Sequence, residues 1–259
     1  MKREDIVAAD KRFVWHPYTQ MKRYVEETDP LVIDRAEGAV LVDVDGKRYL
    51  DGNSSWWVAA LGHNHPRLVR ALTSQAEKLC HTSLAGVTHA PAAALAERLV
   101  GVAPSGLSHV FFSDDGSTAL EAAIKMAVGF HQNRGDIART SFVSLGGAFH
   151  GETLGVTALG GVELFRKSFA SLLMNVHFVP PPKMGEDETG PAAHALTALL
   201  AEKGDSIAAI TLEPLVQGAN GMRLYPAWYL AFARKLCDQH GALLIIDEVF
   251  TGYGRTGTF

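Results

Sequence analysis

The stretch HVFFSDDGSTALEAAIKMAVGFHQ (109–132) decides the fold, because it changes from an apolar run to a polar turn and then to a helical pattern. Residues 109–113 predict a short strand that is buried on both faces. After the turn, apolar side chains recur at helical spacing, at Leu120, Ile124, Ala127 and Val128. A buried strand that leads directly into such a helix is a typical unit of α/β proteins.

The same alternation continues along the rest of the chain. Apolar runs that predict strands lie at 141–145, 176–179, 207–215 and 242–250, and helical patterns lie at 191–204 and 226–241. Since these runs are short, nearly continuous and separated by helices, we expect a mainly parallel sheet flanked by helices, with right-handed crossovers. The predicted fold class is therefore α/β.

The preceding residues predict a different arrangement. Segments 31–34 and 39–52 alternate apolar and polar side chains, and Asp45-Gly46 stands where a hairpin turn is needed. Helical spacing replaces this alternation over 66–80, with Pro66 in the first turn. We therefore expect an N-terminal β-hairpin segment ahead of the parallel sheet.

Composition argues against several classes of protein. The 259 residues carry 24 Lys and Arg against 28 Asp and Glu, a net charge of −4, so we expect no nucleic-acid partner. The apolar run ALLII (242–246) is far shorter than the ~20 residues of a membrane span, and the charged N-terminus lacks the apolar segment of a secretory signal. We expect a cytoplasmic protein with no membrane segment. Cys80 and Cys237 have no metal or redox spacing, and His63 and His65 are better explained by capping and packing than by a metal.

Polar side chains gather where the predicted strands end, which is where open α/β sheets bind ligands. The turn 113–118 offers backbone N–H groups and hydroxyls at a helix N-terminus, which suit a phosphate group. Phe149 and His150 could cover a planar ring, and Asp247 ends a buried strand, where a carboxylate needs a cation or a donor. An ordinary cap, simple packing and a salt bridge would explain each feature singly. Together they fit pyridoxal phosphate, with Asp247 paired to the pyridinium nitrogen.

Longer motifs carry a resemblance to the class III aminotransferases of fold type I. The shared motifs are DGSTALEAAIKMA (115–127), FHGET (149–153), LEPLVQGANGM (212–222) and LLIIDEVFTGYGRTG (243–257). The resemblance implies that residues 1–65 form an N-terminal arm and part of a small domain. It also implies that residues 66–259 belong to an incomplete large domain that binds pyridoxal phosphate, and that the protein is a homodimer.

The resemblance implies roles for two groups of residues. Those implied to bind the cofactor are Gly116, Ser117 and Thr118 at the phosphate, Phe149 and His150 at the ring, and Asp247, also catalytic, at the ring nitrogen. Those implied to line the substrate pocket are Tyr18, Trp56, Trp57 and Glu213. Since neighbours on an extended segment point in opposite directions, we expect only one of the two tryptophans to face the site.

Two departures from the family pattern stand out. Phe149 replaces the usual tyrosine, which keeps the stacking but removes a hydroxyl that could help position the substrate amine. The family's Schiff-base lysine follows the aspartate by a few tens of residues, whereas only 12 residues follow Asp247 and none is lysine. Lys125 and Lys235 match no family position. We therefore expect this chain to be the N-terminal part of an enzyme.

Two further motifs narrow the resemblance to the branch of the family that acts in biotin biosynthesis. They are WHPYTQ (15–20) and DGNSSWW (51–57). This branch implies S-adenosylmethionine as the amino donor and 8-amino-7-oxononanoate as the acceptor. The alternatives are a class III aminotransferase acting on an ω-amino acid or ornithine, and an inactive remnant of the same fold.

Overall fold

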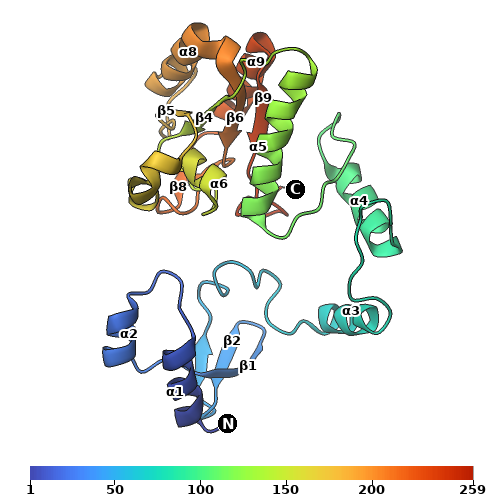
Figure 1. The fold of residues 1–259 in the computed structure, drawn as a ribbon, viewed down its shortest axis with the longest axis vertical. Coiled ribbons are helices and arrows are strands. Elements are labelled where there is room, and N and C mark those ends of the chain that lie inside the picture. Colours follow the sequence, from blue (N-terminus) through green and yellow to red (C-terminus); the bar gives the residue numbers. More distant parts are fainter. Residues whose placement is uncertain (259) are drawn as a thin grey trace. The chain divides into compact units, whose positions relative to one another are not determined.

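The computed structural model describes residues 1–258, and its elements form two compact units, Met1–Ala90 and Pro91–Phe259 (Figure 1). The division falls after Ala90, and the domain boundary predicted after residue 65 stays a prediction.

The first unit combines helices with a small antiparallel sheet. Its elements are α1 (Arg3–Phe13), α2 (Met21–Glu27), β1 (Ile33–Glu37), β2 (Val40–Asp43), β3 (Arg48–Leu50) and α3 (Pro66–Ala76). The strands pair in the order β1-β2-β3, and Gly46 takes a positive φ of 84° in the turn between β2 and β3. The predicted hairpin is confirmed.

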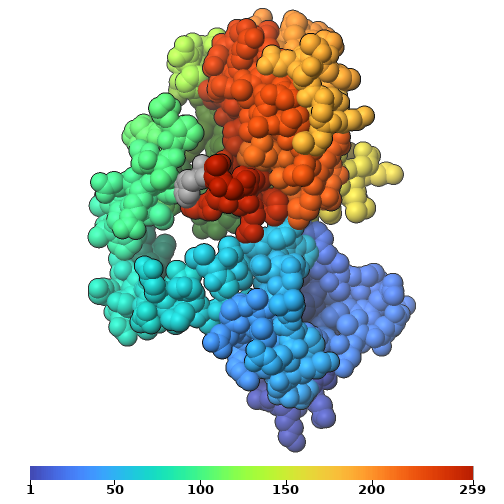
Figure 2. All heavy atoms as spheres, turned by 180° about the vertical axis from the view of Figure 1, so that it is seen from behind, coloured from blue at the N-terminus to red at the C-terminus, as the bar shows by residue number. Residues whose placement is uncertain are grey.

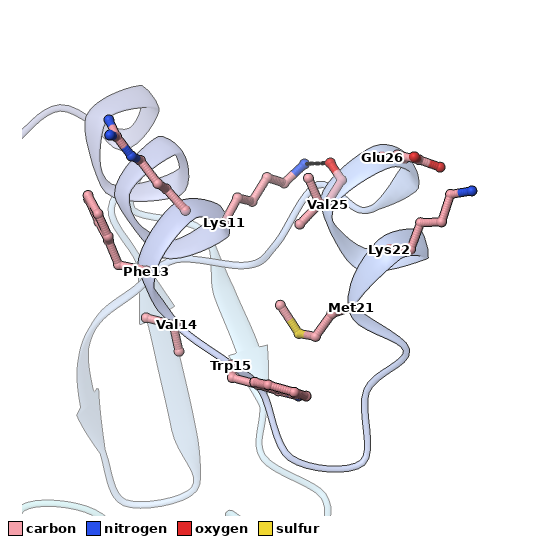
Figure 3. Close-up of a pocket in the computed structure, with 9 residues that line it drawn as sticks. Lys11, Phe13, Val14, Trp15, Met21, Lys22, Val25 and Glu26 are labelled. Carbon is pink, nitrogen blue, oxygen red and sulfur yellow. Dashed lines mark hydrogen bonds between the residues drawn. The ribbon is translucent and has the colours of Figure 1, made fainter.

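Helices α1 and α2 lie beside an open hollow of about 530 Å³ (Figure 3). Hydrogen bonds join the two helices, from Lys11 Nζ to the carbonyl oxygen of Val25 at 2.9 Å and from the Tyr24 hydroxyl to Asp10 Oδ2 at 2.6 Å. His16 and Tyr24 both contact the carboxylate of Asp10, so the loop between the helices is fixed at its start. This loop carries Tyr18.

The second unit is built on a four-stranded parallel sheet in the order β5-β4-β6-β9. These strands are β4 (Ser141–Leu145), β5 (Val176–Val179), β6 (Ile207–Leu212) and β9 (Leu243–Ile246). The other elements of this part of the chain are α4 (Ala90–Val102), α5 (Gly116–Asn133), α6 (Leu154–Leu159), α7 (Glu163–Arg166), η1 (Lys167–Leu172), α8 (Pro191–Lys203), η2 (Gly204–Ser206), α9 (Trp228–His240) and the short pair β7 (Val216–Gln217) and β8 (Arg223–Leu224). A parallel sheet with crossover helices confirms the predicted α/β class.

Helices cover both faces of this sheet (Figure 1). On one face α8 and α9 pack on inward side chains of the strands such as Val143 and Ile210. Their atoms, orange to red, are prominent on the side shown in Figure 2. On the other face α5 and α6 pack on Phe142 and its neighbours. Since each fully buried large apolar side chain contributes about 1.5–3 kcal/mol, the two clusters make the sheet a firm platform for the loops at its edge.

The strand predicted at residues 109–113 is wrong. This segment has no regular structure, and Phe111 is 66% exposed. A strand is stabilised by hydrogen bonds to a neighbouring strand, and no strand in the described range 1–258 pairs with these residues. An apolar run therefore does not form a strand unless a neighbouring strand is available to pair with it.

The last strands end earlier than their apolar runs suggested. β6 ends at Leu212 and β9 at Ile246, so Glu213 and Asp247 are the first residues beyond them. Both carboxylates therefore belong to the loops at the carboxyl edge of the sheet. None of the helices in residues 1–258 has the length and apolar content needed to span a bilayer.

Candidate functional site

Three strand exits of the second unit meet at one edge of its sheet, because parallel strands end on the same side. The loop after β4 carries Phe149 and His150, Glu213 follows β6, and Asp247 follows β9. The first turn of α5 lies against the last of these loops. A Cβ on Gly116 would come within 2.6 Å of Val249 Cγ2, so glycine is needed for this approach.

Asp247 and His150 form a buried pair. The Nδ1–H of His150 donates to Asp247 Oδ2 at 2.8 Å, and the backbone N–H of Val249 donates to Oδ1 at 3.0 Å. The two side chains are 6% and 0% exposed. The Nε2 atom of His150 is also buried and has no hydrogen-bond partner among residues 1–258. Because buried polar atoms are rarely left unpaired, this edge of the sheet is suited to a bound polar group.

Glu213 joins two loops through its carboxylate. Oε1 accepts the backbone N–H of Phe149 and Oε2 accepts that of Gly218, each at 3.0 Å. Burial raises the pKa of the Glu213 carboxyl above its ordinary value, and these backbone donors offset part of the effect. Tyr225 donates its hydroxyl to the backbone oxygen of Glu213. The carboxylate thereby fixes the backbone that presents Phe149.

The ring of Phe149 is partly buried and has an aromatic neighbour. Phe165 meets it edge-on, with ring centroids 5.5 Å apart. Sequence reasoning missed Phe165, because it lies on the short helix α7, where no motif marks it. A ring held at its edge and by its backbone is suited to stack on a flat ligand.

The first turn of α5 forms a cradle with the loop after His150. Gly151 has a φ of +118°, and a Cβ there would lie 2.1 Å from Ser117 Oγ. Ser117 Oγ accepts the backbone N–H of Glu152 at 3.4 Å. The first amides of a helix have no partner within the helix and favour an anion. The cradle therefore fits a phosphate group at Gly116 and Ser117.

Thr118 contributes to this turn as part of an ordinary helix cap, the alternative that the sequence left open. Its backbone N–H donates to Asp115 Oδ1 at 2.8 Å, and its hydroxyl accepts the N–H of Asp115 at 3.0 Å. This reciprocal capping box fixes the start of the helix. A phosphate contact of Thr118 stays a prediction.

A second residue that sequence reasoning missed anchors the loop from the side of α5. Glu121 Oε1 accepts from Thr153 Oγ1 at 2.5 Å, from Gly155 N at 2.9 Å and from Val156 N at 3.4 Å. These groups belong to the first turn of α6 and the residue before it, so Glu121 caps that helix. Only the spacing of four residues from Ser117 along α5 hinted at a shared role.

The predicted substrate residues of the first unit form an aromatic pair. The rings of Tyr18 and Trp56 are stacked, with centroids 5.5 Å apart and an angle of 28°. Trp56 and Trp57 lie in a turn in which Ser54, Ser55, Trp56 and Trp57 all have positive φ, of 52°, 48°, 64° and 69°. The segment is therefore not extended. The expectation that only one tryptophan faces the site assumed an extended segment, and that premise was wrong. Each such residue costs about 1–2 kcal/mol relative to a right-handed conformation.

Asp51 is the centre of hydrogen bonding in this turn. It accepts from the backbone and the hydroxyl of Ser55 and pairs with His63 Nε2 at 2.7 Å. These donors lower the pKa of Asp51 to about 2. His63 therefore serves in packing and hydrogen bonding, and the described residues hold no group of three or more side chains suited to a metal ion.

The predicted residues thus fall into two sets, each within one unit. Phe149, His150, Glu213, Asp247 and the first turn of α5 meet in the second unit, while Tyr18 and Trp56 meet in the first.

Comparisons with known proteins agree with this geometry. The family model "Aminotransferase class-III" matches residues 22–259. The adenosylmethionine-8-amino-7-oxononanoate aminotransferase of Geobacter sulfurreducens is 42% identical over 259 residues, which cover 96% of this chain and 56% of the relative. The chain spans about half the length of the curated relatives it matches.

Solved structures show the same likeness. The crystal structure of the adenosylmethionine-8-amino-7-oxononanoate aminotransferase of Methanocaldococcus jannaschii has a TM-score of 0.93 and 38% identity, covering 99% of this chain and 57% of that one. The omega transaminase of Pseudomonas jessenii in complex with PMP has a TM-score of 0.88 and 32% identity, covering 96% and 57%. This chain belongs to the class-III aminotransferase family.

Proposed function

We propose that the protein to which these residues belong is a pyridoxal-phosphate-dependent aminotransferase that moves an amino group from S-adenosylmethionine to 8-amino-7-oxononanoate. The observation that carries the chemistry is the buried Asp247–His150 pair at the carboxyl edge of the sheet. The substrate assignment is supported by the names of curated relatives that are 38–42% identical.

The residues of the second unit suit the cofactor. When bound, pyridoxal phosphate supplies an electron sink for the pair left when the Cα–H bond of an amino substrate breaks. Asp247 would accept the ring N–H and stabilise its positive charge, while His150 and the N–H of Val249 hold the carboxylate in place. Phe149 would stack on the ring, and Gly116, Ser117 and Thr118 would bind the phosphate at the positive end of α5.

The substrate side of the proposal uses residues from both units. We assign Tyr18, Trp56, Trp57 and Glu213 to substrate binding. Both carboxylate oxygens of Glu213 already accept hydrogen bonds from backbone N–H groups, so the main contribution of Glu213 would be to hold Phe149 in position.

A homodimer and a cytoplasmic location are part of the same proposal. The resemblance supports both, and the two free cysteines, Cys80 exposed and Cys237 buried, support the location, because free thiols persist in reducing compartments. The solved omega transaminases support a related alternative with an ω-amino acid as donor, although their identities of 31–32% are below those of the curated relatives.

The test uses the natural gene product. Borohydride reduction followed by intact-mass measurement should show a pyridoxyl adduct, and an assay should show S-adenosylmethionine preferred over β-alanine and ornithine as donor. Asp247→Ala should abolish turnover, because the ring nitrogen loses its carboxylate. Binding of the cofactor with a preference for ornithine would overturn the substrate assignment alone. Absence of an adduct, or normal turnover in Asp247→Ala, would overturn the catalytic assignment.

A further inference from the structure

We propose that Asp51 and His63 form a clamp that holds Trp56 against Tyr18, and that this clamp sets the affinity of the enzyme for its amino substrate. The assignment of Trp56 to the substrate pocket rests on the proposed function. Neither Asp51 nor His63 is proposed to touch the substrate, so both are positioning residues.

The turn 54–57 has an unfavourable backbone conformation, although it contains local hydrogen bonds from Trp56 N to Asn53 Oδ1 at 3.3 Å and from Trp57 N to the oxygen of Asn53 at 2.8 Å. Four successive residues have φ between 48° and 69°, and none of them is glycine. Chirality disfavours each such residue by a factor of about 5 to 30. A run of four therefore persists only where surrounding contacts impose it.

The stacked pair of Tyr18 and Trp56 stabilises the turn only weakly. Trp56 is 62% exposed and Tyr18 is 59% exposed. A stack in which both partners face solvent to this extent removes little apolar surface from water, and the hydrophobic gain is proportional to that area. The stack of Tyr18 on Trp56 therefore adds little to the stability of the turn.

Asp51 stabilises the turn through two hydrogen bonds from Ser55. Asp51 Oδ1 accepts the N–H of Ser55 at 2.9 Å, and Oδ2 accepts the Ser55 hydroxyl at 2.8 Å. The side chain of Asp51 is only 6% exposed, whereas its partner Ser55 is an exposed residue. Ser55 directly precedes Trp56, and fixing its backbone fixes the direction of the tryptophan.

His63 connects Asp51 to the sheet of the first unit by hydrogen bonds. His63 Nε2 lies 2.7 Å from Asp51 Oδ2. The backbone of His63 pairs with Gly38, which lies between β1 and β2, through bonds of 2.8 and 3.1 Å. Asp51 also donates its own N–H to the oxygen of Ala39 at 2.9 Å. A continuous path of hydrogen bonds therefore runs from the hairpin through the clamp to Ser55, the residue before Trp56.

The primary test is Asp51→Asn in the natural gene product, as holoenzyme. We expect KM for S-adenosylmethionine to rise by about 5- to 30-fold, the factor for releasing one left-handed residue. The value of kcat and the absorbance of the bound cofactor should stay close to wild type. Hydrogen exchange of a peptide covering 51–59 should become faster.

A matched control separates positioning from general stability. Asp43 is a similarly buried carboxylate in the same unit, and it accepts from Lys47 N and the Tyr49 hydroxyl, both at 2.8 Å and within the β2–β3 hairpin. Asp43→Asn should lower the melting temperature without raising KM or the exchange rate of the 51–59 peptide. A rise in KM in Asp43→Asn equal to that in Asp51→Asn would overturn the clamp.

Rescue by glycine tests the role of the backbone. Ser54 has a φ of 52°, and the described side-chain bonds of Asp51 run to Ser55 and His63, so Ser54→Gly leaves the clamp residues in place. Glycine adopts positive φ readily. Adding Ser54→Gly to Asp51→Asn should therefore lower KM back toward wild type.

The outcomes separate this inference from the proposed function. Unchanged exchange and unchanged KM in Asp51→Asn would overturn the clamp. Faster exchange with unchanged KM would overturn its link to the substrate. If the wild-type protein lacks transaminase activity, the proposed function and that link both fail, while the exchange measurement still decides whether Asp51 holds the turn.

Discussion

Gly151→Ala tests the phosphate cradle, because the glycine is required there for two separate reasons. Its φ of +118° is rarely adopted by other residues, which costs about 1–3 kcal/mol. The new Cβ would also lie 2.1 Å from Ser117 Oγ, so the hydroxyl must rotate and lose its bond to Glu152 N, at a cost of about 0.5–1.5 kcal/mol. The free energy of unfolding should fall by about 1.5–4.5 kcal/mol, which lowers the melting temperature by about 3–18 °C.

Affinity for pyridoxal phosphate should fall by a different amount, because the backbone strain is present with and without the cofactor. Only the displaced Ser117 hydroxyl affects binding, and a hydrogen bond to a charged group is worth about 1.5–3 kcal/mol. The dissociation constant should therefore rise by about 10- to 150-fold. The assay is a cofactor titration followed by absorbance, beside thermal unfolding of the same samples.

Gly129→Ala is the matched control. Gly129 lies inside α5 with open space around it, so alanine should stabilise the helix by about 0.5–1 kcal/mol and leave cofactor affinity unchanged. A Gly151→Ala protein that binds the cofactor as tightly as wild type would refute the assignment of Ser117 Oγ to the phosphate.

Three further variants probe the second unit. Tyr229→Phe should raise the free energy of unfolding by about 1 kcal/mol or more in urea denaturation, because the buried Tyr229 hydroxyl has no partner in the described part of the chain; a loss of stability would contradict this. Glu213→Gln should become more stable relative to wild type as the pH rises. An acid whose folded pKa is raised contributes stability below its unfolded pKa and loses that contribution as the pH rises through the folded pKa. Urea unfolding at pH 4 and pH 8 should show this sign, and a difference that does not change with pH would contradict it. Glu121→Ala should cost about 1.5–3 kcal/mol and speed hydrogen exchange in α6, because three donors lose their acceptor, whereas Glu163→Ala on the exposed side of α7 should change neither quantity.

The sequence predicted the sheet of the second unit well because buried parallel strands leave a strong signal. β4 and β5 match their predicted ranges, and the exits that carry Phe149, Glu213 and Asp247 meet as expected. The segment 109–113 has the same apolar character yet forms no strand, since a strand depends on a partner that local composition does not reveal.

The turn 54–57 was beyond prediction for a related reason. Serine and tryptophan have no preference for positive φ, and the conformation depends on Asp51, whose second partner, His63, is 12 residues away along the chain. The sequence DGNSS indicates a turn but not its handedness. Likewise, no local pattern shows that Glu121 caps a helix more than thirty residues further on.

The strand order β5-β4-β6-β9 bears on how the sheet is made during synthesis. β4 is translated first and pairs with both β5 and β6, and β9 then pairs with β6. Each later strand therefore leaves the ribosome when its partner is already present. Pairing of distant parallel strands is slow in a free chain because long loops must close, but vectorial growth lets this sheet lengthen one strand at a time, outward from β4.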